Sequence, residues 1–167
     1  KGTEDGVQQQ TISIVDDDFP PKVSLSVASP TINEDTGSTT STTVLVSLSA
    51  VSQKTVTVTL EKSGTATETK DYTLEGTIAI PAGEPSASVV LSAVSDFLNE
   101  TNETVVIDII NVDNGTEQGS QQQSVTIQDD DVAPTVSLSV QNATISETGG
   151  STQVTATLNT SSSLTVT

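Results

Sequence analysis

The chain has 167 residues and carries 22 Asp or Glu against five Lys, with no Arg, His or Cys, so its formal net charge is −17. This balance excludes nucleic acid as a partner, because phosphates need a basic surface, and the absence of Cys excludes disulfides, thiolate nucleophiles and Cys-ligated metals. No apolar run approaches the roughly 20 residues that span a bilayer and no basic amphipathic stretch is present, so we expect no membrane contact by this segment.

A repeat of 113 residues organises the chain. Residues 6–18 return as residues 119–131, and Val-Ser-Leu-Ser-Val at 23–27 returns unchanged at 136–140. A period this long indicates whole domains in series, because the units of a solenoid are much shorter. We therefore predict the last strand of a preceding repeat at 1–19, a complete repeat at 20–131, and the first strands of a following repeat at 132–167, with both ends inside a longer array.

The complete repeat reads as a succession of strands. Apolar residues alternate with Thr and Ser, which is the pattern of a strand with one face toward a core and one toward water. Seven such runs occur, at 23–27, 44–48, 56–60, 78–80, 89–91, 105–109 and 125–127. Turn residues such as Gly64, Gly76 and Asn114-Gly115 separate them. We predict an all-β fold, a seven-strand antiparallel β-sandwich of the immunoglobulin-like kind, with a core of Val, Ile and Leu.

The connections between repeats are short and contain proline. Pro20-Pro21 precedes the complete repeat and Pro134 precedes the following one. Proline restricts the backbone, whereas Gly/Ser-rich linkers are flexible. We expect head-to-tail domains with limited freedom at each junction.

Acidic residues gather where the predicted strands end. They are Glu34 after the first strand, Asp71 after the third, Asp96, Glu100 and Glu103 after the fifth, and Asp129, Asp130 and Asp131 after the seventh. These connections open at one end of a seven-strand sandwich, so the eight carboxylates can converge. Two carboxylates about 4 Å apart repel by roughly 1 kcal/mol even in water, so such a group requires a cation. Oxygen-only ligands in this number favour Ca²⁺ over Mg²⁺; the alternative is that each acid is a solvated turn residue.

Five motifs in a fixed order carry a family resemblance. They are Val23-Ser24-Leu25 leading to Glu34, Gly64-Thr65-Ala66 leading to Asp71-Tyr72, Pro81-Ala82-Gly83-Glu84, the stretch from Asp96 to Glu103, and Ile127-Gln128-Asp129-Asp130-Asp131. In this combination, residues 20–131 resemble the Calx-beta domain, the calcium-binding sandwich of sodium–calcium exchangers that also occurs in tandem in large extracellular proteins. The family often has an acidic run where this chain reads Ser95-Asp96-Phe97, so one carboxylate is missing.

The resemblance also implies a set of metal ligands. It assigns all eight carboxylates to the calcium site and adds the backbone carbonyl of Leu98. It places four further acidic residues in incomplete sites of the neighbouring repeats, namely Asp16, Asp17, Asp18 and Glu147.

These observations predict a calcium-binding structural spacer of a large secreted or cell-surface protein, an adhesin or a filament, in which calcium stiffens each domain and its junction. Expected partners are calcium ions, adjacent repeats of the same chain, and other copies or cell-surface ligands. Two alternatives stay open: a regulatory calcium sensor like the exchanger domains, and a repeat that itself mediates adhesion.

Catalysis and glycosylation are two further possibilities. A carboxylate pair such as Glu100 and Glu103 is the machinery of glycoside cleavage, but the chain has no His and only three aromatic residues on which a sugar could stack, so we expect no enzyme. Asn-X-Ser/Thr sites begin at Asn99, Asn102, Asn114, Asn142 and Asn159. In a chain this rich in Ser and Thr, chance accounts for most of them, and two fall inside the predicted calcium loop.

Overall fold

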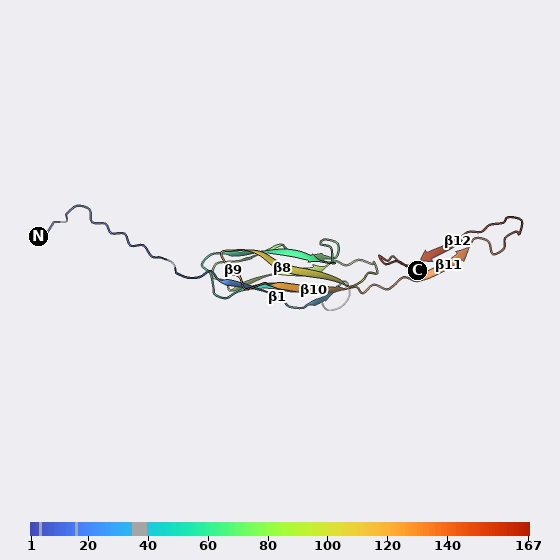
Figure 1. Ribbon diagram of the computed structural model, residues 1–167, viewed down its shortest axis with the longest axis horizontal. Helices are drawn as coiled ribbons and strands as arrows, with labels where there is room; N and C mark the ends of the chain where they lie inside the picture. The colour runs from blue at the N-terminus through green and yellow to red at the C-terminus, as the bar shows by residue number, and fades with distance from the viewer. Residues whose placement is uncertain (4, 16, 35–39) are drawn as a thin grey trace.

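The computed structural model describes residues 1–3, 5–15, 17–34 and 40–167, and these contain strands, turns and loops but no helix (Figure 1). Among these residues there is accordingly no helix with the length and apolarity needed to cross a bilayer. The strands are β1 (Lys22–Val27), β2 (Thr31–Asn33), β3 (Ser41–Leu48), β4 (Val56–Gly64), β5 (Tyr72–Thr73), β6 (Thr77–Ile80), β7 (Ser86–Ala93), β8 (Glu103–Asp113), β9 (Thr116–Glu117), β10 (Gln122–Gln128), β11 (Val136–Val140) and β12 (Val154–Leu158).

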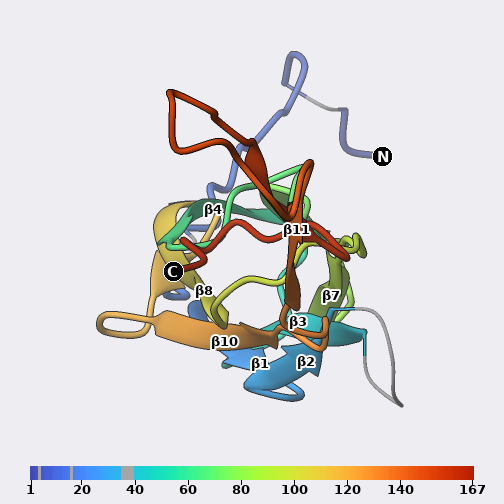
Figure 2. The same cartoon turned by 90° about the vertical axis from the view of Figure 1, so that its right-hand side faces the viewer.

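Residues 22–34 and 40–128 form a sandwich of two five-stranded sheets, ordered β5-β7-β3-β1-β9 and β2-β10-β8-β4-β6 (Figures 1 and 2). The seven predicted runs all lie in strands, and the all-β sandwich class is confirmed. The predicted strand number was too low, because β2, β5 and β9 are two or three residues long and too short to show a period of two. The sheets are also not purely antiparallel, since β9 pairs parallel with β1 and β2 parallel with β10.

The core lies between the sheets and consists almost entirely of branched aliphatic side chains. Alternate residues of each long strand are buried, as in β3, where Val44 and Val46 are fully buried and Leu45 between them is partly exposed. Burying one such side chain stabilises the fold by about 1.5–3 kcal/mol. Tyr72 joins this core, whereas Phe19 and Phe97 lie exposed on the surface.

A change of sheet near Pro30 positions the first acidic loop. The chain leaves β1 in one sheet, turns, and enters β2 in the other sheet, where Ile32 pairs with Ile127 of β10. The Thr126 N–H donates to the Pro30 carbonyl at 2.8 Å and the Glu34 N–H donates to the Gln128 carbonyl at 3.0 Å. Glu34 therefore lies beside the end of β10, where the Asp129–Asp131 triplet begins.

The chain before β1 and the chain after β10 extend from opposite ends of the sandwich (Figure 1). The described residues before β1 form no strand, and Ile12 and Ile14 are almost fully exposed. Their repeat counterpart, β10, is paired on both sides, with β8 and with β2. After the sandwich, β11 and β12 form a separate hairpin in which Val136 pairs with Leu158. The division into a preceding, a complete and a following repeat stays a prediction.

Candidate metal centre

Two groups of three carboxylates lie at the end of the sandwich that faces the β11–β12 hairpin. Glu34, Asp96 and Asp131 form the first group, which we name the Glu34 triad. The second is named the Asp71 triad and consists of Asp71, Glu100 and Glu103. In each group one carboxylate oxygen from each residue lies within 4.8 Å of one such oxygen from the other two residues. Each triad draws on loops that are distant in sequence, so only the folded sandwich assembles it.

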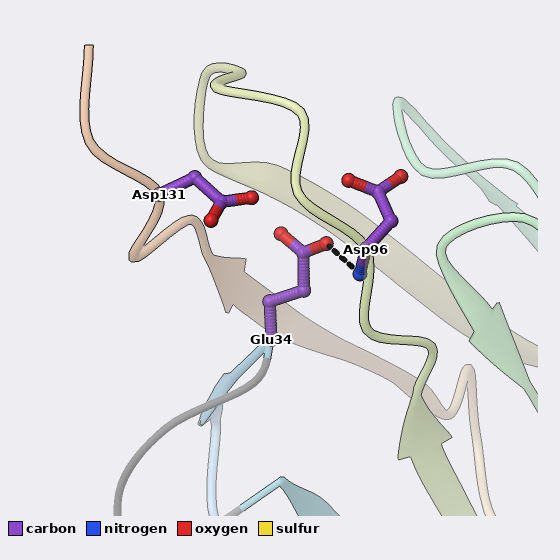
Figure 3. Close-up of side chains that lie close together, drawn as sticks. All are labelled: Glu34, Asp96 and Asp131. Atoms are coloured by element: carbon purple, nitrogen blue, oxygen red, sulfur yellow. Dashed lines mark hydrogen bonds between the residues drawn. The ribbon is translucent and has the colours of Figure 1, made fainter. Parts of the chain in front are cut away.

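In the Glu34 triad, three side chains from three connections point toward one another (Figure 3). Glu34 follows β2, Asp96 lies between β7 and β8, and Asp131 follows β10. The Asp96 N–H donates to Oε1 of Glu34 at 3.2 Å, and the Leu98 N–H donates to Oδ1 of Asp96 at 2.6 Å. Glu34 is only 9 % exposed, so its carboxylate is held in place and largely out of water.

The Asp71 triad is built from the loop before β5 and the loop before β8. Oδ2 of Asp71 accepts the Thr67 N–H at 2.5 Å, and the Asp71 N–H donates to the Thr67 carbonyl at 2.9 Å, so a tight turn fixes this carboxylate. Glu103 is the first residue of β8, and its carboxyl lies next to that of Asp71, so its protonated form can donate a hydrogen bond to Asp71. Glu100 completes the group from the same loop as Asp96.

The Asp71 triad and Glu34 line one small cleft, and the carboxylates of the two triads influence each other electrostatically. The cleft is lined by Glu34, Asp71, Glu100, Thr101, Glu103, Ile127 and Asp129. Burial, aided by the charges of nearby Asp residues, raises the pKa of Glu34 from 4.5 to about 7. Burial also raises the pKa of Glu103 from 4.5 to about 7, helped by the hydrogen bond and charge of Asp71 and by the charge of Glu34. The protein therefore holds carboxylates together at an energetic cost.

A buried oxygen of Asp129 lacks the partner that such atoms normally have. Asp129 Oδ2 accepts a hydrogen bond from Asn99 Nδ2 at 3.2 Å, but Oδ1 is buried with no hydrogen-bond partner in the described structure. An unsatisfied buried oxygen of a carboxylate is costly, and native structures seldom leave one without a reason such as an ion. Asp129 and the triads thus offer only hard oxygen donors, which suit calcium.

Six carboxylates of this group have no lysine partner in the described part of the chain. In the part of the chain that the structure describes, the ion pair is between Lys62 and Glu68. No carboxylate of the Asp71 triad pairs with a lysine there, and neither does Glu34, Asp96 or Asp129. The arrangement therefore fits a bound cation better than a set of internal salt bridges.

The structure brings together most of the predicted ligands but not all of them. Asp130 belongs to neither triad and its side chain is exposed. Leu98 contributes its N–H to Asp96, and the predicted role of its carbonyl stays a prediction. Of the acids assigned to neighbouring sites, Asp16 lies outside the described residues, whereas Asp17, Asp18 and Glu147 are exposed and outside both triads.

Two asparagines belong to the centre although sequence reasoning treated them only as glycosylation sites. Besides its bond to Asp129, Asn99 donates from Nδ2 to the Asp131 carbonyl at 3.1 Å. Oδ1 of Asn102 accepts the Asp129 N–H at 3.3 Å. Both side chains hold the segment after β10 against the loop before β8, so their amides stabilise the arrangement of these two loops. Their place in the sequence between the predicted ligands Asp96 and Glu103 was the signal that could have identified them as part of the centre.

Solved structures show which known fold the sandwich shares. The apo-form Calx CBD1 domain is 22 % identical, with a TM-score of 0.53 over 66 % of this chain and 99 % of that one. The calcium binding domain CBD12 of CALX1.1 is 20 % identical, with a TM-score of 0.55 over 71 % of this chain and 50 % of that one. CBD12 from CALX1.2 is 22 % identical, with a TM-score of 0.52 over 65 % of this chain and 44 % of that one. The chain has a Calx-beta-like fold, and it spans about half the length of the tandem CBD12 proteins.

Comparisons of sequence add no further identification. No protein-family model matches the chain, and no curated protein sequence matches it. The Calx-beta resemblance therefore stands on the motifs and on the three-dimensional fold.

Proposed function

We propose that the sandwich binds calcium at the two triads and that the chain is a spacer segment of a tandem array in a large secreted or cell-surface protein. The observation that carries the calcium assignment is the cleft in which the Asp71 triad and Glu34 meet beside the unpartnered Oδ1 of Asp129. Its support from the fold is the likeness to domains described as calcium binding.

Each residue of the centre has a definite task in this proposal. The Glu34 triad and the Asp71 triad supply the negative charge, and the backbone N–H groups of Asp96 and Thr67 orient two of the carboxylates. Asn99 and Asn102 hold Asp129 in position. Bound calcium supplies the positive charge that offsets the repulsion within the cleft.

The position of the centre connects calcium binding to the junction. Asp131 belongs to the Glu34 triad, and only four residues separate it from Val136, the first residue of β11. One of those residues is Pro134, which restricts the backbone. Calcium held by Asp131 restrains the start of this connection, and this restraint is how the proposed spacer keeps successive domains extended.

The proposed setting is extracellular, where modules of this kind bind calcium at about 0.1–1 mM and ambient calcium keeps them loaded. The tandem repeat, the proline-containing connections and the cysteine-free acidic composition support this setting. In this proposal the chain binds ions and neighbouring repeats and has no catalytic task.

A regulatory sensor is the second candidate, and the likeness to the Calx CBD domains favours it. A sensor needs affinity near or below the micromolar range, whereas a spacer functions at about 0.1–1 mM. Calorimetric titration of the chain with calcium separates the two: a dissociation constant of about 1 μM or lower supports the sensor.

Thermal unfolding of the chain tests calcium binding itself. Circular dichroism is recorded with about 2 mM calcium, with the same concentration of magnesium, and with a chelator. We expect a rise in the unfolding midpoint that is selective for calcium, because a ligand that binds only the native state stabilises it. Equal midpoints in all three conditions would show that the carboxylates are a solvated surface.

A further inference from the structure

Asn99 connects the metal centre to the segment that follows the β11–β12 hairpin. Its backbone carbonyl accepts the Ser163 N–H at 3.2 Å and the Ser162 hydroxyl at 3.2 Å. The same residue donates from its side chain to Asp129 and to the Asp131 carbonyl. One residue of the acidic loop therefore contacts both the chain leaving the sandwich and a loop of the next unit.

The contacted loop has a counterpart in the sandwich. Val23 of β1 pairs with Leu48 of β3, and Val136 of β11 pairs with Leu158 of β12, so Leu48 and Leu158 occupy matching positions. Four residues further along each chain segment stand Ser52 and Ser162.

Both serines make the same turn. Oγ of Ser52 accepts the Lys54 N–H at 3.0 Å, and Oγ of Ser162 accepts the Leu164 N–H at 3.1 Å. A hydrogen bond to the amide two residues on is the mark of a serine turn. The loop at 51–54 is thus built like the loop at 161–164 that meets Asn99.

In the sandwich this loop presents an unused donor. Gln53 is the counterpart of Ser163, and its N–H makes no hydrogen bond in the part of the chain that the structure describes. The loop is nevertheless fixed, because the Ser52 carbonyl accepts the Gly83 N–H at 2.9 Å. It lies at the end where the chain enters, since the Ser49 N–H donates to the Lys22 carbonyl at the start of β1.

We propose that residues 51–54 are a docking surface for the acidic loop of the preceding repeat. The occupant is the backbone carbonyl that matches Asn99 in that repeat, which receives the Gln53 N–H and the Ser52 hydroxyl. The proposal rests on the tandem array proposed above. It makes each domain carry a metal centre at one end and the receiving loop for its neighbour's centre at the other.

Amide hydrogen exchange measured by NMR tests this docking. In the full chain we expect the Ser163 N–H to exchange at least about tenfold more slowly than the Gln53 N–H, because only the former is hydrogen-bonded. In a longer chain, residues 1–131 are followed directly by residues 19–167, which preserves the repeat spacing. There the Gln53 N–H of the second copy should slow to the rate of Ser163. An unchanged rate in the second copy, or equal rates in the full chain, would overturn the proposal.

A matched pair of variants tests whether the Ser162 hydroxyl, which meets Asn99 and also closes the serine turn, holds this contact. Ser162→Ala removes the hydroxyl that meets Asn99, and we expect it to speed exchange of the Ser163 N–H about fivefold, the loss of one ordinary hydrogen bond. Ser161→Ala changes an exposed neighbour and should leave that rate unaltered. Equal effects of the two variants would contradict the docking contact.

The same samples distinguish failure of docking from failure of the proposed function. Calcium titration is performed on the longer chain in parallel. Calcium binding without slowed exchange of Gln53 refutes docking and leaves the metal centre intact. Slowed exchange without calcium binding refutes the metal centre and supports docking.

Discussion

Replacing Glu34 by Gln should raise the stability of the calcium-free chain and reduce the additional stabilisation that calcium provides. The substitution removes a negative charge but keeps the side-chain volume and the oxygen that accepts the Asp96 N–H. At about pH 8 Glu34 is ionised, and a pKa raised from 4.5 to about 7 means that its charge destabilises the folded state by roughly 3 kcal/mol. The cleft opens to solvent, which screens part of this repulsion, so we expect the variant to be about 1–2 kcal/mol more stable in chelator. For a domain of this size that gain raises the unfolding midpoint by about 5–10 °C.

Calcium should stabilise this variant less than the original chain. At about 2 mM calcium and a dissociation constant of about 0.1 mM, one bound ion stabilises the native state by about 1.8 kcal/mol. Loss of one charged ligand that weakens binding about tenfold reduces this increment to about 0.6 kcal/mol. Chemical unfolding with urea in chelator and in calcium measures both values.

A control variant and a contrary result make this prediction decisive. Glu61→Gln alters an exposed residue of β4 that faces Asp108 across the sheet, and any small change in its stability should be the same with and without calcium. If Glu34→Gln lowers stability in chelator, Glu34 is an ordinary buried acceptor and the reasoning from carboxylate repulsion is wrong. If both variants reduce the calcium increment equally, the effect is one of overall charge.

Three other perturbations test the remaining structural claims. Glu34 and Glu103, whose pKa values are raised, bind more protons in the folded than in the unfolded state between about pH 4.5 and 7. The calcium-free chain should therefore lose stability as pH rises through this window. Urea unfolding midpoints in chelator measure this, and midpoints that increase with pH would contradict the prediction. Calcium competes with these protons, so calorimetry should find weaker binding at about pH 5.5 than at pH 7.5. Gly64→Ala should cost about 3 kcal/mol or more, since its φ is 116° and a Cβ would lie 2.2 Å from the Thr104 carbonyl oxygen, whereas Gly76→Ala meets open space and should stay within about 1 kcal/mol by thermal unfolding. Asp129→Asn combined with Asp130→Asn should weaken calcium binding and make the full chain more flexible in small-angle scattering with calcium present; an unchanged dissociation constant would remove Asp129 from the centre.

Sequence reasoning was strongest for the long strands of the sandwich. In β3 and β8 the alternation of apolar residues with Thr, Ser or other partners is carried over four or more positions, and the alternate side chains are buried as the pattern predicts. The short strands were not predicted, because two or three residues are too few to show the alternation of apolar and polar side chains. Their existence depends on pairing with a neighbour, as β2 pairs with β10.

For the metal centre, sequence reasoning identified the acids but not their grouping. Placing Glu34 and Asp131 at the same end followed from the order of the strands. That Glu34 joins Asp96 and Asp131, and Asp71 joins Glu100 and Glu103, depends on the sheet change near Pro30 and on the turn at Thr67. The predicted ligand Asp130 has the same charge and nearly the same place in the chain as its neighbours, yet its side chain is exposed and belongs to neither triad.

The sequence by itself determined the properties that composition and periodicity encode: an all-β sandwich with an aliphatic core, an internal sequence repeat, and hard oxygen donors at strand ends in a chain with only five lysines. Only the tertiary structure decided which carboxylates meet, which oxygen of Asp129 lacks a partner, and that Asn99 touches both the outgoing chain and the next loop. The physical reason is the distance along the chain over which each property is set. Alternation is a local property of a strand, whereas a metal centre is assembled from side chains separated by up to about a hundred residues, whose distances are set by strand pairing and packing.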